Sequence, residues 1–132
     1  MITISQYFQA KPHTADHVVA AYDLLKRVDS LLQCLNYTVP LCPNTGTAIS
    51  GSKGGSGDGG FRLNTATTGA ALSSHKTGQG IDIYDPVNHL DAILTDTLLA
   101  QAGLYREAPS ETQGWTHLTT RAPHSGNRTF LP

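Results

Sequence analysis

The clearest periodicity in this chain lies between residues 14 and 35, where apolar side chains recur every three or four positions. That spacing predicts a long amphipathic helix. Thr14 is a suitable N-cap, His17 takes the place of the Glu or Gln of a capping box, and Asn36 marks the end. The apolar face comprises Val18, Ala21, Leu25, Val28, Leu32 and Leu35, widened by Val19, Tyr22, Leu24 and Leu31. We expect this helix to be the scaffold and to pack on more than one side.

The length and charge of the chain limit the kinds of protein it can be. Its 132 residues fit a single domain over 1–132. Charged residues make up only 14% and the formal net charge is -1, which argues against a nucleic-acid partner and against a polybasic membrane anchor. No apolar run approaches the roughly 18 residues of a membrane span. Residues 1–10 lack a basic region, a long apolar stretch and a small-residue cleavage site, so we expect no signal peptide.

Two cysteines, Cys34 and Cys42, are too few for a disulfide framework. They would close a small loop if the protein met an oxidising compartment. Free thiols that behave as small apolar side chains are the favoured interpretation, because no secretion signal is evident.

A glycine-rich stretch covers residues 50–60 and contains six glycines, in the segment GSKGGSGDGG. It offers few side chains that a core could bury, so we expect a flexible loop. A phosphate-binding loop is the alternative, but no Gly-Lys-Ser or Gly-Lys-Thr ending follows and no strand–loop–helix frame surrounds it. A mobile loop beside a functional site is the better interpretation.

Short strands and a second helix are predicted for the rest of the chain. Asp85 and Pro86 are suited to open a helix that ends at Gly103, with an apolar stripe from Val87 to Ala102. Strands are predicted at 60–63, 80–84, 104–106 and 115–119. The tail from 121 to 132 is irregular, and it is either an interaction arm or a strand closing the sheet edge. This order predicts an α+β domain with a small, mainly antiparallel sheet flanked by helices.

Three residues stand out as carriers of chemistry: His75, Asp82 and His117. Gly78 and Gly80 allow a tight turn between His75 and Asp82, and alternation in the 80–84 strand places Asp82 opposite the apolar Ile81 and Ile83. Two imidazoles and one carboxylate match the protein ligands of a catalytic zinc, leaving a position for water. A structural hydrogen bond between Asp and His is the alternative, and by spacing alone it is the commoner arrangement.

Residues 73–82 resemble the S-x-H-x-x-G-x-A-x-D signature of the peptidase M15 family, with Gly80 at the Ala position. Phe61-Arg62 resembles the upstream aromatic-Arg pair of that family, and Trp115-Thr116-His117 resembles its downstream W-x-H. The resemblance spans about residues 60–118. The family comprises D-Ala-D-Ala carboxypeptidases and dipeptidases and phage L-alanyl-D-glutamate endolysins. Its fold, shared with the hedgehog signalling domain, is a small antiparallel sheet flanked by helices.

The resemblance implies a role for each matching residue. His75, Asp82 and His117 would be the zinc ligands, and Arg62 would contact a substrate oxygen and stabilise the developing oxyanion. Ser73 would line the site and bind substrate, and Trp115 would wall the pocket. The alternatives are a surface salt bridge for Arg62, a turn-capping hydroxyl for Ser73 and a core position for Trp115.

One departure from the family pattern concerns proton transfer. The family places Asp or Glu three residues before the last ligand, where this chain has Gly114. Glu111 lies three residues further back, on a segment that would have to bring it to the site. We therefore predict Glu111 as the base if the protein is an enzyme, with an exposed glutamate of no role as the alternative.

Two functions follow from the resemblance. The first is a zinc-dependent peptidase cleaving peptidoglycan stem peptides, of the carboxypeptidase or endolysin type. The second is a non-catalytic phage virion or cell-wall-binding protein of the same fold, with phage structural proteins as partners and Gly114 as the trace of lost catalysis. Without a signal peptide, we expect the protein in the cytoplasm of the producing cell or associated with a virion.

Overall fold

The structure, a computed structural model, describes residues 1–52, 58–66 and 72–132 and is built on a four-stranded sheet of order β1-β3-β2-β4. Three strands are antiparallel neighbours, β1 (Gly80–Tyr84), β3 (Trp115–Thr119) and β2 (Tyr105–Glu107). The last strand, β4 (Thr129–Phe130), runs parallel to β2 at the edge. The predicted α+β class is confirmed, and the tail contributes an edge strand.

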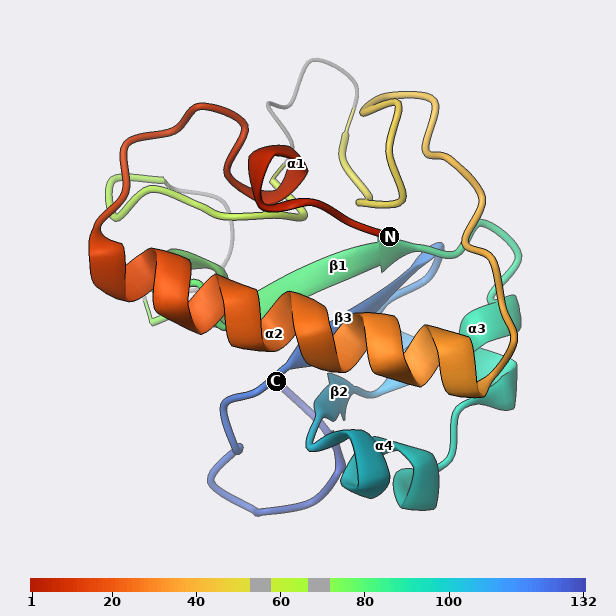
Figure 1. The fold of residues 1–132 in the computed structure, drawn as a ribbon. Coiled ribbons are helices and arrows are strands. Elements are labelled where there is room, and N and C mark those ends of the chain that lie inside the picture. Colours follow the sequence, from red (N-terminus) through yellow and green to blue (C-terminus); the bar gives the residue numbers. More distant parts are fainter. Residues whose placement is uncertain (53–57, 67–71) are drawn as a thin grey trace.

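Helix α2 (Ala15–Cys34) crosses one face of this sheet (Figure 1). The predicted N-cap Thr14 is confirmed, since its hydroxyl accepts from the His17 amide. The His17 side chain accepts from the Thr14 amide and completes a capping box without Glu or Gln. The buried side chains of this helix are Ala21, Leu24, Leu25, Val28 and Leu31. Val19 and Tyr22 are exposed, so the prediction that they widen the apolar face is wrong. They lie one turn apart on the side of the helix that faces solvent.

A short helix, α1 (Ile4–Phe8), precedes α2 and was not predicted. Thr3 caps it through a capping box with Gln6, and Tyr7 and Phe8 enter the core. Five residues are too few to display a periodic stripe, so only the cap residues mark this helix in the sequence.

The single helix predicted after Asp85 is two helices, α3 (His89–Ile93) and α4 (Asp96–Ala102). Leu94 adopts an extended backbone between them, and Thr95 starts α4 by accepting from the Leu98 amide. The helix begins at His89 and its N-cap is Asn88, so the predicted start at Asp85 and Pro86 is wrong. The Asp85 carboxylate nevertheless accepts from the amides of Leu90 and Asp91 in the first turn. Apolar residues at helical spacing on both sides of the break explain the prediction of one continuous helix.

Residues 60–63, predicted as a strand, belong to no strand. Their backbone amides are taken by other partners, since Phe61 donates to the Tyr7 carbonyl and Arg62 donates to the His75 carbonyl. Of the predicted glycine-rich loop, residues 53–57 lie outside the described residues. Its ends adjoin β1, where the Ser50 amide donates to the Asp82 carbonyl and the Asp82 amide donates to the Gly59 carbonyl.

The two faces of the sheet differ in character, as the alternation in 80–84 predicts. Ile81 and Ile83 of β1 and Leu118 of β3 join the core beneath α2. Asp82 and His117 belong to the opposite face.

Among the described helices, none is long and apolar enough to cross a membrane. Cys34 is exposed, Cys42 is buried, and both are free thiols.

Candidate metal centre

The centre of the site is the pair Asp82 and His117, which face each other across β1 and β3. Nδ1 of His117 lies 2.8 Å from Oδ1 of Asp82. Because Asp82 and His117 are directly opposite each other on neighbouring strands, their side chains project from the same face of the sheet, side by side.

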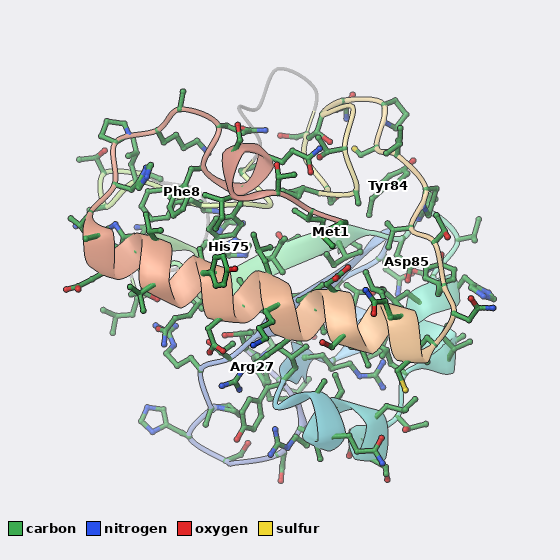
Figure 2. The ribbon with its side chains drawn as sticks, in the orientation of Figure 1. Met1, Phe8, Arg27, His75, Tyr84 and Asp85 are labelled. Carbon is green, nitrogen blue, oxygen red and sulfur yellow. The ribbon has the colours of Figure 1, made fainter. Side chains whose placement is uncertain are left out.

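His75 reaches this pair from the short 3-10 helix η1 (Ser74–Thr77), where Ser73 is the N-cap and accepts from the His75 amide. Gly78 ends η1 with φ +80°, which lets the chain turn back into β1. Nε2 of His75 lies 3.2 Å from the same Asp82 oxygen, Oδ1. Nδ1 of His75 lies 2.8 Å from the Gly60 carbonyl oxygen, so Nδ1 donates there and Nε2 faces the cluster. Figure 2 labels His75 and Tyr84, which lie toward opposite ends of β1.

These three residues fit a metal ion in spacing, burial and chemistry. One ligand atom from each lies within 4.8 Å of the others, and all three residues are at least nine-tenths buried. Bonds of 2.0–2.1 Å in a tetrahedral site separate neighbouring ligand atoms by about 3.3 Å. The distance of 3.2 Å between His75 Nε2 and Asp82 Oδ1 is already close to that value. The buried cluster of His75, Asp82 and His117 can therefore hold a metal ion.

The charge state of Asp82 suits this role. Burial on its own raises the pKa of this carboxyl, but the charge of His75 and the hydrogen bonds from His117 and His75 outweigh burial. The net effect holds the pKa of Asp82 well below its usual range, so the carboxylate is ionised at neutral pH.

The two oxygens of the Asp82 carboxylate have different partners, because Arg62 lies next to only one of them. Nη2 of Arg62 lies 3.5 Å from Oδ2, whereas both imidazoles approach Oδ1. Nε of Arg62 donates to the Asp58 carbonyl at 2.6 Å, which fixes the guanidinium beside the cluster. Oδ1 is thus the oxygen available to a metal ion, and Oδ2 is held by a positive charge.

Ser74 contacts the cluster although the sequence directed attention to Ser73. The Ser74 hydroxyl oxygen lies 3.4 Å from Nε2 of His117 and is buried. A Cβ atom on Gly80 would overlap with this hydroxyl and would lie 3.1 Å from Cε1 of His117. Glycine in place of Ala at position 80 therefore leaves room for the Ser74 side chain. In the sequence, Gly80 together with Ser74 is the signal that could have indicated the contact between Ser74 and His117.

A cavity of about 440 Å³ opens over the cluster. It is bordered by all seven residues that the sequence singled out: Arg62, Ser73, His75, Asp82, Glu111, Trp115 and His117. Trp115 is half-buried at the start of β3, so it walls the cavity and does not lie in the core. Glu111 ends the short 3-10 helix η2 (Pro109–Glu111) and is exposed.

Glu107 and Arg121 also border the cavity, and neither was predicted as a site residue. Glu107 is the last residue of β2, one residue beyond the strand predicted at 104–106. Burial raises the pKa of the Glu107 carboxyl, and the charges of Asp82 and Glu111 act in the same direction. Only the pairing of β2 with β3 brings Glu107 toward His117, and that pairing is long-range.

Gly114 has no side chain to offer to the site, and its backbone is engaged elsewhere. Its φ is +91°, its amide donates to Oδ1 of Asn88 and its carbonyl accepts from the Asp85 amide. The turn before β3 therefore serves to connect η2 to the sheet. The carboxylates of the cavity wall outside the cluster are those of Glu107 and Glu111.

Comparison of the chain with protein-family models found no match. Comparisons with curated proteins and with solved structures likewise found none.

Proposed function

We propose that the protein is a zinc-dependent peptidase that cleaves peptidoglycan stem peptides, as a carboxypeptidase or an endolysin. The observation that carries the proposal is the convergence of His75, Asp82 and His117 beneath an open cavity. Two histidines and one carboxylate are a donor set that zinc accepts, with a coordination position left for the reaction. The resemblance of residues 73–82 to the M15 signature supports both the metal and the substrate class.

In this proposal a metal ion would be held by His75, Asp82 and His117, whose facing atoms are Nε2, Oδ1 and Nδ1. The chemistry that zinc supplies when bound is polarisation of the scissile carbonyl and a lowered pKa of water. The Arg62 guanidinium stabilises negative charge on the carbonyl oxygen as it develops. Ser73 and Trp115 orient the peptide along the cavity wall. Proton transfer falls to a carboxylate of that wall, for which the sequence proposed Glu111.

Mass spectrometry of muropeptides incubated with the zinc-loaded protein tests this function directly. We expect a mass loss of one terminal alanine for a carboxypeptidase, or release of the stem peptide without its first L-alanine for an endolysin that cuts after L-alanine. The matched control is His117→Ala, which removes one ligand and should abolish cleavage. Intact muropeptides after incubation with fully zinc-loaded wild type would contradict the proposal.

The second candidate is a non-catalytic virion or cell-wall-binding protein that keeps the metal site. The observation that favours it is Gly114, which occupies the position of the family's base. Pull-down on purified peptidoglycan sacculi distinguishes the two functions. Zinc-dependent retention on sacculi without release of any fragment would support the binding role.

A further inference from the structure

Glu107 shares one row of the sheet with two of the proposed metal ligands. β2 pairs with β3 so that Tyr105 lies opposite Thr119 and Arg106 lies opposite Leu118. Extending this antiparallel register by one residue places Glu107, the last residue of β2, opposite His117 and on the other side of β3 from Asp82. Residues in one row across neighbouring strands project from the same face. Asp82, His117 and Glu107 thus line one face in that order.

The Glu107 carboxylate is available for chemistry at this cavity. It is half-buried and borders the same cavity as the cluster. Within residues 1–52, 58–66 and 72–132 it takes part in no hydrogen bond or ion pair. Asp91, a buried carboxylate, is by contrast bonded by Thr116 and Arg106. A half-buried carboxylate without such partners beside a metal cluster has no structural task that accounts for its position.

Glu111 is the other carboxylate of the cavity wall, and its setting differs. It ends η2, is exposed, and lies in the connection that leads to Gly114. Glu107 is held instead by a strand that is bonded to β3 on one side and to β4 on the other. A group that transfers protons works best when a rigid element holds it within hydrogen-bond reach of the reacting atoms.

We propose that Glu107 is the proton-transferring residue of this site, in the role that Gly114 cannot fill; this inference rests on the proposed peptidase function. The Glu107 carboxylate accepts a proton from a water molecule as the water oxygen bonds to the scissile carbonyl carbon. The C–N bond then breaks, the electron pair leaves with the nitrogen, and Glu107 returns the proton to that nitrogen. The products are a carboxylic acid and an amine, and the Glu107 carboxylate is regenerated.

Kinetics of Glu107→Gln beside Glu111→Gln tests the assignment, because each amide keeps the shape of its carboxylate and removes the basicity. We expect kcat on muropeptides to fall by about 10²–10⁴-fold for Glu107→Gln. We expect Glu111→Gln to lower kcat by less than Glu107→Gln does, and Glu107→Asp to recover part of the loss. Zinc content, measured by elemental analysis, should be unchanged in all three variants, which also shows that they fold.

A crystal structure of the zinc-loaded wild type with a phosphinate dipeptide gives a second test that does not depend on turnover. The phosphinate mimics the tetrahedral arrangement at the attacked carbon, so a Glu107 carboxylate oxygen should lie within hydrogen-bond distance of a phosphinate oxygen. Three results would overturn the role of Glu107 and leave the peptidase function standing. They are full activity of Glu107→Gln, loss of zinc from Glu107→Gln, and Glu111 in place of Glu107 beside the phosphinate. Zinc-loaded wild type that cleaves no muropeptide would overturn the peptidase function, and the role of Glu107 with it.

Discussion

The hydroxyl of Ser74 occupies the space that a methyl group on Gly80 would need. The same hydroxyl lies 3.4 Å from Nε2 of His117, on the side of the imidazole away from Asp82. Without a metal, Nδ1 of His117 donates to Asp82; with a metal on Nδ1, the Ser74 hydroxyl is placed to accept a hydrogen bond from Nε2–H. The position of the Ser74 side chain therefore depends on Gly80, because any larger residue at position 80 would occupy the space of the Ser74 hydroxyl.

We expect Gly80→Ala to weaken zinc binding by about 10- to 100-fold, since the added methyl group displaces Ser74 and presses on the His117 ring. Isothermal titration with zinc measures the change. The double variant Gly80→Ala, Ser74→Ala removes the overlapping oxygen and should bind zinc more tightly than Gly80→Ala alone. Equal affinities for the single and double variants would show that the pair does not act through this contact.

Removal of a proposed ligand should abolish stoichiometric zinc binding. Elemental analysis of His75→Ala and His117→Ala after zinc reconstitution should show the loss of about one equivalent relative to wild type. His124→Ala is the matched control, because His124 is exposed and outside the cluster. Full zinc content in both ligand variants would exclude this centre.

Arg62→Gln should lower the affinity for zinc by about 10-fold or more, because Oδ2 of Asp82 loses the charge that holds it. Competition with a chromophoric chelator measures this affinity. Arg121→Gln is a matched control. Arg121 borders the same cavity and donates to the Leu72 carbonyl, and within the described residues it makes no hydrogen bond or ion pair with Asp82. An equal loss in both variants would point to the overall charge of the cavity and not to the Asp82 contact.

Tyr7→Phe should lower the free energy of unfolding by about 1–3 kcal/mol at neutral pH, because the buried Tyr7 hydroxyl donates to the Gly80 carbonyl at 2.9 Å. Urea denaturation measures the difference between the two proteins. Burial raises the pKa of Tyr7 above its usual value, and the charge of Asp82 acts in the same direction.

The sign of the pH effect follows from that raised pKa. Above a pH of about 10 the unfolded chain loses the tyrosine proton while the folded protein keeps it, so rising pH favours unfolding. The phenylalanine variant lacks this contribution. Its stability deficit relative to wild type should therefore shrink between pH 9 and pH 11, and a constant deficit would contradict the assignment.

Local sequence patterns predicted the elements that carry their own signals. The apolar stripe and capping box of α2 and the alternation of β1 are encoded within a few consecutive residues. The division of residues 85–103 into α3 and α4 was missed, because Leu94 interrupts the helix without interrupting the apolar spacing. The unpredicted α1 is too short for any periodicity.

By itself, the sequence determined which residue types are available to the site. Residue types and motif spacing singled out seven residues, among them His75, Asp82 and His117, and the structure places all seven around one cavity. Only the tertiary structure decided how these groups act on one another. It turned both imidazoles toward Oδ1 of Asp82, set Ser74 against His117, and brought Glu107 into the row of Asp82 and His117. The physical reason is that strand pairing joins residues distant in the chain, and no local pattern in the sequence fixes which strands pair or in what register.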